Sequence, residues 1–263
     1  MKKKDIVVVV PVYKTSLSIE EKASLDQCVS LLSEYTLIFI TPCQMNTDFL
    51  QSDYPMFRIE SFPDLYFLSI RGYNKLVLEY QFYERFKVYQ YLLIYQLDAY
   101  VFRDELLFWA LKGYDYIGAP WLPIDPEKRN PLKFITSIKH FIYQSIGNPR
   151  YRKWKYYEYE IGNGGFSLRK ISKMLDVTSY YRDKIEQLLA DDAPFYPEDV
   201  FLCLEVKHKK LRLKKPRFEE AMKFSMEVGC EWAYDYNNRQ LPFGCHAWYH
   251  KNYSPFWRDI IKL

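Results

Sequence analysis

The feature that most constrains the fold is a run of β-branched residues near the start of the chain. Residues 6–10 read Ile-Val-Val-Val-Val and are followed directly by Pro11. β-Branched side chains favour extended backbone, and a run that is apolar on both faces predicts a strand covered on both sides, as in a parallel sheet. A membrane span needs ~18 apolar residues, and no stretch of the sequence approaches that length.

Strand-like and helix-like segments alternate over the first 120 residues. Short apolar runs predict further strands at 36–40, 57–62, 91–95 and 115–121, and helical patterns cover 18–32, 73–86 and 103–112. Ser18 and Glu21 have the spacing of a capping box at the start of the first helix. The alternation indicates βαβ units, so the expected fold class is α/β, with a Rossmann-like, mostly parallel sheet flanked by helices.

The second half of the sequence is organised differently. Residues 123–159 interleave aromatic residues with basic ones, and we interpret them as an insertion with a basic face. The basic residues are Lys128, Arg129, Lys133, Lys139, Arg150, Arg152, Lys153 and Lys155. A loop leading into a strand is expected at 162–169, with helices beginning near 170 and 197 and an irregular C-terminal third. No linker or repeat divides the chain, so a single domain over 1–263 is expected.

Composition and missing motifs exclude several classes of protein. The net charge of +4 is too small to indicate a nucleic-acid partner. The five cysteines include no CxxC pair, which indicates reduced thiols and a cytoplasmic location. The sequence has no GxGxxG after the first strand and no Walker A, HExxH or GxSxG motif, which argues against dehydrogenases, P-loop proteins, zincins and α/β-hydrolases. The 19% of aromatic residues suits a sugar- or base-binding surface, although low genomic GC content explains it equally well.

Asp98 is the first candidate for a functional role. It follows the predicted strand at 91–95 and therefore lies at the carboxyl edge of a parallel sheet, where ligands bind. Its carboxylate suits Mg²⁺ or Mn²⁺, but an Asp at this point also caps a following helix. Gly164 and Gly165 lack a Cβ and allow close approach of a ligand, or simply a tight turn.

Two acidic residues and a histidine follow later in the chain. Glu198 and Asp199 occupy the first turn of a predicted helix, where a carboxylate either acts as a general base or complements the helix dipole. His246 stands in a Gly-Cys-His-Ala-Trp context, which suits a metal ligand and a core histidine about equally. A metal carboxylate, a close-approach loop, a base and a late metal ligand occur in the order that transfer from a phosphate-bearing donor needs.

Four segments resemble a bacterial family of GT-A-type glycosyltransferases. They are residues 93–102, 162–169, 197–201 and 243–248. The resemblance implies a metal-dependent hexosyltransferase with a single GT-A domain, which uses Mn²⁺ or Mg²⁺ and a nucleotide-sugar donor, in particular a UDP-sugar. The Asp-x-Asp element of such enzymes reads Gln96-Leu97-Asp98 here, so its first carboxylate is missing and Asp98 is the residue expected to touch the metal.

The resemblance also implies roles for the remaining site residues. His246 matches the late histidine that completes the metal shell, and Asp199 matches the base of inverting transferases, with Glu198 facing the acceptor. The donor is expected to contact Pro11, Val12, Tyr13, Asn74, Lys75, Gln96, Leu97, Asp98, Gly164 and Gly165.

The implied reaction transfers a sugar, with inversion, to a hydroxyl of a glycan or glycolipid in bacterial surface polysaccharide or lipooligosaccharide synthesis. The expected partners are the nucleotide sugar and this acceptor, with peripheral contact at the inner face of the cytoplasmic membrane and no nucleic acid. Donor sugar, linkage and oligomeric state are not indicated. Two alternatives stay open: a nucleotidyltransferase acting on a sugar phosphate, and a non-catalytic RNA- or glycan-binding module that uses the basic aromatic segment.

Overall fold

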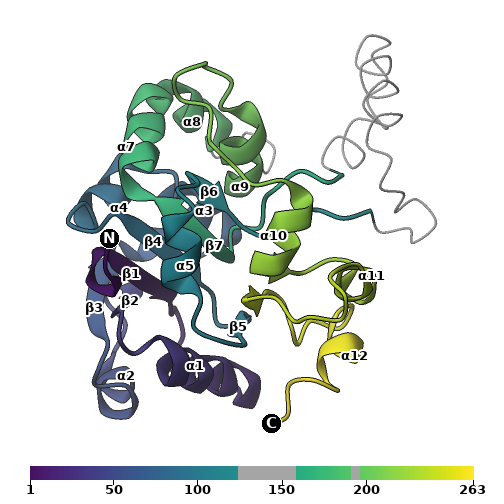
Figure 1. Ribbon diagram of the computed structural model, residues 1–263. Helices are drawn as coiled ribbons and strands as arrows, with labels where there is room; N and C mark the ends of the chain where they lie inside the picture. Colours follow the sequence, from purple (N-terminus) through teal and green to yellow (C-terminus); the bar gives the residue numbers. More distant parts are fainter. Residues whose placement is uncertain (124–157, 191–195) are drawn as a thin grey trace.

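The computed structural model describes residues 1–123, 158–190 and 196–263 (Figure 1). Within these ranges, six strands form the central sheet in the order β3-β2-β1-β4-β7-β6. They are β1 Ile6–Pro11, β2 Thr36–Pro42, β3 Arg58–Phe62, β4 Tyr91–Tyr95, β6 Tyr116–Ile117 and β7 Phe166–Lys170. Strands β1 to β4 pair in parallel, while β7 is antiparallel to both β4 and β6. The predicted mostly parallel sheet is confirmed.

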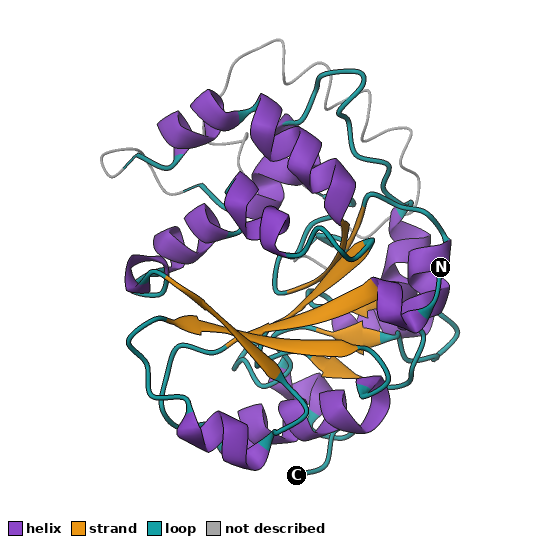
Figure 2. Ribbon diagram, turned by 90° about the vertical axis from the view of Figure 1, so that its left-hand side faces the viewer, coloured by secondary structure: helices purple, strands orange, loops and turns teal. Residues whose placement is uncertain are grey.

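Strand β1 lies inside the sheet, and residues 6–10 are completely buried. Val7 and Val9 belong to the apolar cluster on one face, whereas Ile6, Val8 and Val10 belong to the cluster on the other. Full burial of one such side chain contributes ~1.5–3 kcal/mol. The unbroken β-branched run therefore stabilises both layers at once, and Figure 2 shows helices on both sides of the sheet.

Eleven α-helices can be assigned within the described ranges. They are α1 Ile19–Leu32, α2 Asp48–Asp53, α3 Ile70–Leu76, α4 Tyr80–Arg85, α5 Leu106–Leu111, α7 Ile171–Tyr180, α8 Arg182–Leu188, α9 Glu198–Val200, α10 Phe218–Phe224, α11 Cys230–Tyr236 and α12 Ser254–Trp257. Helices α1, α2 and α5 contribute to one apolar cluster, and α3, α4 and α7 to the other. The capping box of α1 is confirmed, since the Glu21 N–H donates to Ser18 Oγ (3.2 Å) and the Ser18 N–H to Glu21 Oε2 (2.8 Å).

Three predicted elements differ from the structure. The helix expected over 73–86 is two short helices, because α3 ends at Leu76 and the chain turns through the buried residues Val77 and Leu78 before α4. The carbonyl of Val77 accepts a hydrogen bond from the Tyr83 hydroxyl (2.8 Å), so the break leaves it satisfied. The helix expected over 103–112 begins only at Leu106, and the strand expected over 115–121 shortens to β6.

The C-terminal third, expected to be irregular, contributes to a second sheet in the order β5-β9-β8. It consists of β5 Tyr100–Val101, β8 Ser225–Met226 and β9 Gly244–Cys245. Strands of two residues carry no readable periodicity, which is why the sequence does not predict them. Through this sheet, the segment that follows β4 pairs with β9 in the C-terminal third of the chain.

The predicted insertion at 123–159 lies almost entirely outside the described residues. None of the helices in the described ranges has the length and apolar character needed to cross a membrane.

Candidate functional site

The order of the central sheet reverses between β1 and β4. The chain proceeds from β1 outward to β2 and β3, and then returns to place β4 on the other side of β1. In open α/β sheets, ligands bind at the carboxyl ends of the strands at such a switch point. A cleft of about 350 Å³ lies at this point, lined by Pro11, Tyr13, Glu21, Phe67, Leu68, Ser69, Ile70, Tyr73, Gln96, Leu97, Asp98 and Tyr249.

Half of the residues expected to contact the donor line this cleft. Five do so, namely Pro11, Tyr13, Gln96, Leu97 and Asp98. Val12 instead points into the core. Asn74 is buried and donates a long hydrogen bond to the Tyr196 carbonyl (3.5 Å), and Lys75 is exposed outside the cleft lining.

The second sheet brings Asp98 and His246 together. Strand β5 pairs antiparallel with β9, with Tyr100 opposite Cys245. Asp98 lies two positions before Tyr100 and His246 directly after Cys245, so the two side chains meet where the strands end. The Trp248 N–H donates to the Asp98 carbonyl (3.2 Å), which extends this pairing beyond the strands.

His246 is surrounded by oxygen atoms. Its Nε2 lies 3.1 Å from Asp98 Oδ1 and 3.2 Å from Gln96 Oε1, and its Nδ1 lies 3.0 Å from Glu227 Oε1. Burial alone would lower the pKa of His246, but the charges and hydrogen bonds of Asp98 and Glu227 raise it well above its usual range. Burial would likewise raise the pKa of Asp98, but the charge of His246 and its hydrogen bond lower it.

These residues fit a divalent cation. Asp98, His246 and Gln96 offer a carboxylate, an imidazole and an amide oxygen, which are ligand types that Mn²⁺ accepts. Glu227 would accept the Nδ1–H of His246 and leave Nε2 for the metal, as carboxylates behind metal-bound histidines do. Within the described part of the chain, no group of three His, Cys, Asp or Glu side chains is placed to hold a metal. Gln96 and oxygens of the donor would therefore complete the shell.

The loop that contains Gly164 and Gly165 passes between two charged clusters. A Cβ on Gly164 would lie 2.0 Å from Glu198 Oε1, and a Cβ on Gly165 would lie 2.0 Å from His246 Nε2. Asn163 precedes them with φ 65°, and its Oδ1 accepts from the N–H groups of Gly165 (3.1 Å) and Phe166 (3.3 Å). The missing side chains make room for neighbouring residues of the protein itself.

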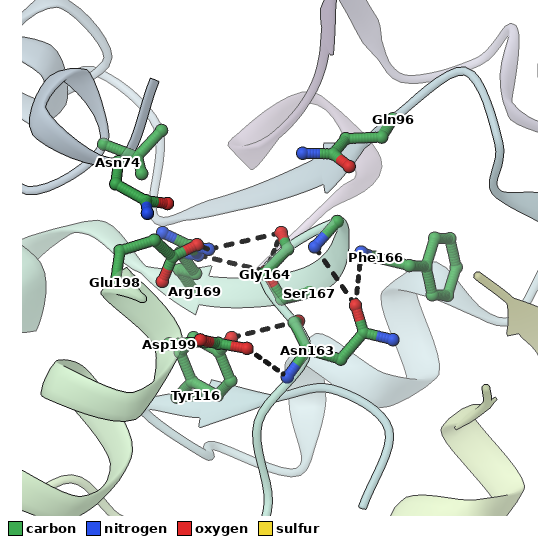
Figure 3. A network of polar contacts seen from close by, with 12 residues as sticks. Asn74, Gln96, Tyr116, Asn163, Gly164, Phe166, Ser167, Arg169, Glu198 and Asp199 are labelled. Carbon is green, nitrogen blue, oxygen red and sulfur yellow. Dashed lines mark hydrogen bonds and ion pairs between the residues drawn. The ribbon is translucent and has the colours of Figure 1, made fainter. Parts of the chain in front are cut away.

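Glu198 forms a buried ion pair with Arg169, with 2.7 Å between Oε1 and Nη2 and almost no exposure of either side chain. Arg169 also donates to Tyr83 Oη (3.0 Å), Ser167 Oγ (3.0 Å) and the Gly164 carbonyl (3.3 Å). Figure 3 shows how this arginine joins β7, the glycine loop and α9. The carboxylate of Glu198 thus faces the protein interior in this structure.

Asp199, the expected base, also contacts the glycine loop. Its Oδ2 accepts from the Asn163 N–H (3.0 Å; Figure 3). Its Oδ1 accepts from the N–H of the neighbouring Val200 (2.8 Å). Burial, followed by the negative charge of Glu198, raises the pKa of Asp199 to about 7. A carboxyl group with this pKa can exchange a proton near neutral pH. Asp199 is not among the residues that line the cleft.

The sequence analysis missed two residues of this site. Arg169 stands in the segment 162–169 without an assigned role, although a lone basic residue in a buried strand signals a buried partner. Glu227 follows the two-residue strand β8 and contacts a histidine 19 positions away, so no local pattern announces it.

The family described as "Protein of unknown function (DUF5672)" matches residues 56–246, a span that begins two residues before β3 and ends at His246. A comparison with curated proteins found no match. Mouse xyloside xylosyltransferase 1 in its apo form is similar in structure, with a TM-score of 0.56 and 11% identity over 94% of this chain and 98% of that one.

The galactosyltransferase LgtC, solved with donor and acceptor sugar analogs, has a TM-score of 0.52 and 12% identity over 94% of this chain and 91% of that one. At such low identity the likeness concerns the fold alone. The fold is that of the GT-A glycosyltransferases, as the resemblance implied.

Proposed function

Because the chain belongs to the DUF5672 family and has a GT-A fold, we propose that it is a metal-dependent hexosyltransferase that uses a nucleotide-sugar donor. The observation that carries the proposal is that Asp98 and Gln96, which both line the switch-point cleft, each have an oxygen within 3.2 Å of His246 Nε2, although His246 itself is not among the lining residues. A carboxylate, an amide oxygen and an imidazole can hold one side of a divalent cation. The other side stays open for the diphosphate oxygens of a donor.

The leaving group of this reaction is a nucleoside diphosphate. A divalent cation, when bound, stabilises the negative charge that develops on it. Asp98 and His246 would hold this cation, and Glu227 would orient His246 from behind. Pro11 and Tyr13 form the wall where the base of the donor, in particular uridine, would lie.

The acceptor hydroxyl attacks the anomeric carbon and must lose a proton. Asp199 is the proposed base, and its raised pKa supports this role because a base works best when its pKa lies near the operating pH. One displacement with one base inverts the anomeric centre. We also propose that Glu198 contacts the acceptor. For this, its buried ion pair with Arg169 has to open.

The proposed acceptor is a glycan or glycolipid of bacterial surface polysaccharide or lipooligosaccharide synthesis. The galactosyltransferase LgtC, solved with donor and acceptor sugar analogs, shares the fold, which supports a sugar acceptor. The basic residues between 128 and 155 suit an anionic acceptor at the inner face of the cytoplasmic membrane. We place the reaction in the cytoplasm.

The experiment is a thermal-stabilisation screen of nucleotide sugars with and without Mn²⁺. A ligand at 100 times its Kd adds about 2.7 kcal/mol to the free energy of unfolding, so a bound donor raises the melting temperature clearly. We expect stabilisation that needs both donor and Mn²⁺ and that disappears in Asp98→Asn but not in the exposed control Asp48→Asn.

Two results would contradict the proposal. One is the absence of any nucleotide-sugar effect. The other is pyrophosphate release from a nucleoside triphosphate and a sugar phosphate, which would identify a nucleotidyltransferase instead.

A further inference from the structure

A dense cluster of cations precedes α10 and has no part in the proposed transfer. Residues 207–217 contain seven Lys and Arg residues and no acidic residue. Six of the seven are exposed and are called the basic patch here: Lys207, Lys209, Lys210, Arg212, Lys214 and Arg217. Since the whole chain has a net charge of only +4, the rest of it is net negative. The basic patch is thus a local concentration of positive charge, separate in the sequence from the basic residues between 128 and 155.

The backbone under the basic patch is fixed. Between 210 and 214 basic and leucine residues alternate; Leu213 is buried, and Leu211 packs against the core. The Lys214 N–H donates to Asp115 Oδ2 (2.9 Å), and Lys173 Nζ donates to the Lys210 carbonyl (2.8 Å). The exposed cations thus stand on an anchored segment.

The charge of the basic patch is not neutralised by the part of the protein that the structure describes. Across these residues, none of the six patch side chains forms an ion pair, and Lys214 Nζ instead lies 5.5 Å from the centre of the Tyr114 ring. The seventh cation, Lys215, is half-buried and pairs with Glu160 (3.3 Å). Cations crowded in this way repel one another and destabilise the folded chain unless an external anion neutralises them.

We propose that the basic patch docks the protein onto an anionic lipid bilayer. Clusters of four to eight Lys and Arg residues bind acidic headgroups, with a gain of about fivefold in partitioning per side chain. Tyr180 is 60% exposed and lies beside His208, with 4.9 Å between ring centroids and the two rings tilted by 39°. Tyrosine is enriched where a protein meets the headgroups of a bilayer.

Single-stranded nucleic acid fits the patch less well, because it is bound by successive aromatic side chains on which bases stack. No Phe, Tyr or Trp occurs within 207–217, so the segment itself offers no succession of aromatic rings; Tyr114 and Tyr180 lie beside it from other parts of the chain. The bilayer proposal does not rest on transferase activity, although a glycolipid acceptor would lie in the same bilayer.

The test is sedimentation of the full chain with lipid vesicles. Vesicles of 30% phosphatidylglycerol in phosphatidylcholine should bind it at 0.1 M NaCl and release it at 0.5 M, because salt screens the attraction. Pure phosphatidylcholine vesicles should not bind it. The triple variant Lys207→Gln, Lys209→Gln, Lys210→Gln should lose about 100-fold in partitioning, at about fivefold per residue.

The matched control neutralises three exposed lysines elsewhere, Lys4→Gln, Lys22→Gln and Lys251→Gln, with the same change in net charge. Both variants should keep the wild-type circular dichroism spectrum and donor stabilisation, so that a failed patch and a failed transferase site give different results. Three results would each overturn the proposal. The two variants could lose vesicle binding equally, or the wild type could fail to bind vesicles. The patch substitutions could also weaken binding of a 20-nucleotide RNA while leaving vesicle binding unchanged.

Discussion

His246 is the residue whose neighbours say most about the site. Asp98 was marked by its place after the predicted strand at 91–95, and His246 by its Gly-Cys-His-Ala-Trp context and by the family resemblance; the structure places the two side chains in contact. No sequence feature indicated Glu227, because its contact with His246 depends on the pairing of two-residue strands. Residues that follow a long apolar strand or stand in a recognisable motif were therefore predictable, and a residue such as Glu227, which has neither signal, was not.

Glu227→Gln tests the support behind His246. The amide keeps the shape but removes the charge that favours a proton on Nδ1 and leaves Nε2 for the metal. Loss of such a supporting carboxylate typically weakens metal affinity 10–100-fold. Titrating Mn²⁺ in the donor-stabilisation assay should show this loss, while Glu231→Gln on the exposed side of α11 should show none. An unchanged Mn²⁺ affinity in Glu227→Gln would remove it from the site.

Asp199 makes stability depend on pH in a direction unusual for an aspartate. Its pKa is about 7 in the folded chain against 3.8 ordinarily, so the folded state holds the proton more tightly between these values. The stabilisation is complete below pH ~4 and is lost as the pH rises through ~7. Over this range the free energy of unfolding should fall by about 2–4 kcal/mol more in the wild type than in Asp199→Asn. Urea unfolding at pH 4.5 and 8 measures the difference, and parallel pH profiles would speak against the raised pKa.

The same substitution tests the proposed base. Asp199→Asn should lower turnover by ~10²–10⁴-fold, because the acceptor hydroxyl loses its proton acceptor, while donor stabilisation survives. In the wild type, kcat/KM should rise with pH around 7, as the carboxyl group ionises. NMR of the product should show an inverted anomeric configuration. Near-normal turnover in the variant, or a retained configuration, would refute the assignment.

At the level of elements, the strands were easier to predict than the helices. Strands β1, β2 and β4 are runs of buried apolar residues, so composition alone marks them. The region over 73–86 has helical periodicity throughout, but Val77 and Leu78 are buried at the break between α3 and α4. Burial of these two residues in the folded chain outweighs their local helix propensity. A local stretch of sequence does not reveal this burial.

The glycine loop can be tested by adding one carbon atom. In Gly165→Ala the new Cβ would lie 2.0 Å from His246 Nε2 and 2.6 Å from Gln96 Oε1, so the arrangement of these side chains must shift. We expect a loss of 1–3 kcal/mol in stability from overpacking, together with loss of Mn²⁺-dependent donor stabilisation.

Gly113→Ala serves as the control for this test. Its new Cβ meets nothing nearer than 4.0 Å, and the cost comes only from φ +70°. This variant should lose ~1–2 kcal/mol of stability and keep the Mn²⁺ response. If Gly165→Ala keeps that response as well, the loop does not hold His246 in place.

On the scale of the whole molecule, the order of strand-like and helix-like segments predicted an α/β fold, and the family resemblance predicted the GT-A fold. What the order does not reveal is how β7 and α9 are held together across the interior. The structure answers this with Arg169, a fully buried cation that pairs with Glu198 and also bonds Tyr83 on α4. This buried ion pair connects β7 with α9, which are distant in the sequence.

Arg169→Met should therefore destabilise the entire fold. Methionine keeps the apolar volume but leaves the Glu198 carboxylate buried without a counter-ion, which typically costs 3–5 kcal/mol. Replacing both partners, as in Arg169→Met with Glu198→Met, should recover much of the loss, because no unpaired charge remains. Urea unfolding measures both variants. The exposed pair of Arg239 and Asp235 provides the comparison, since Arg239→Met should cost no more than ~1 kcal/mol. If Arg169→Met cost as little as Arg239→Met, the carboxylate would have to reach water in the folded chain, and Glu198 would be open to the acceptor after all.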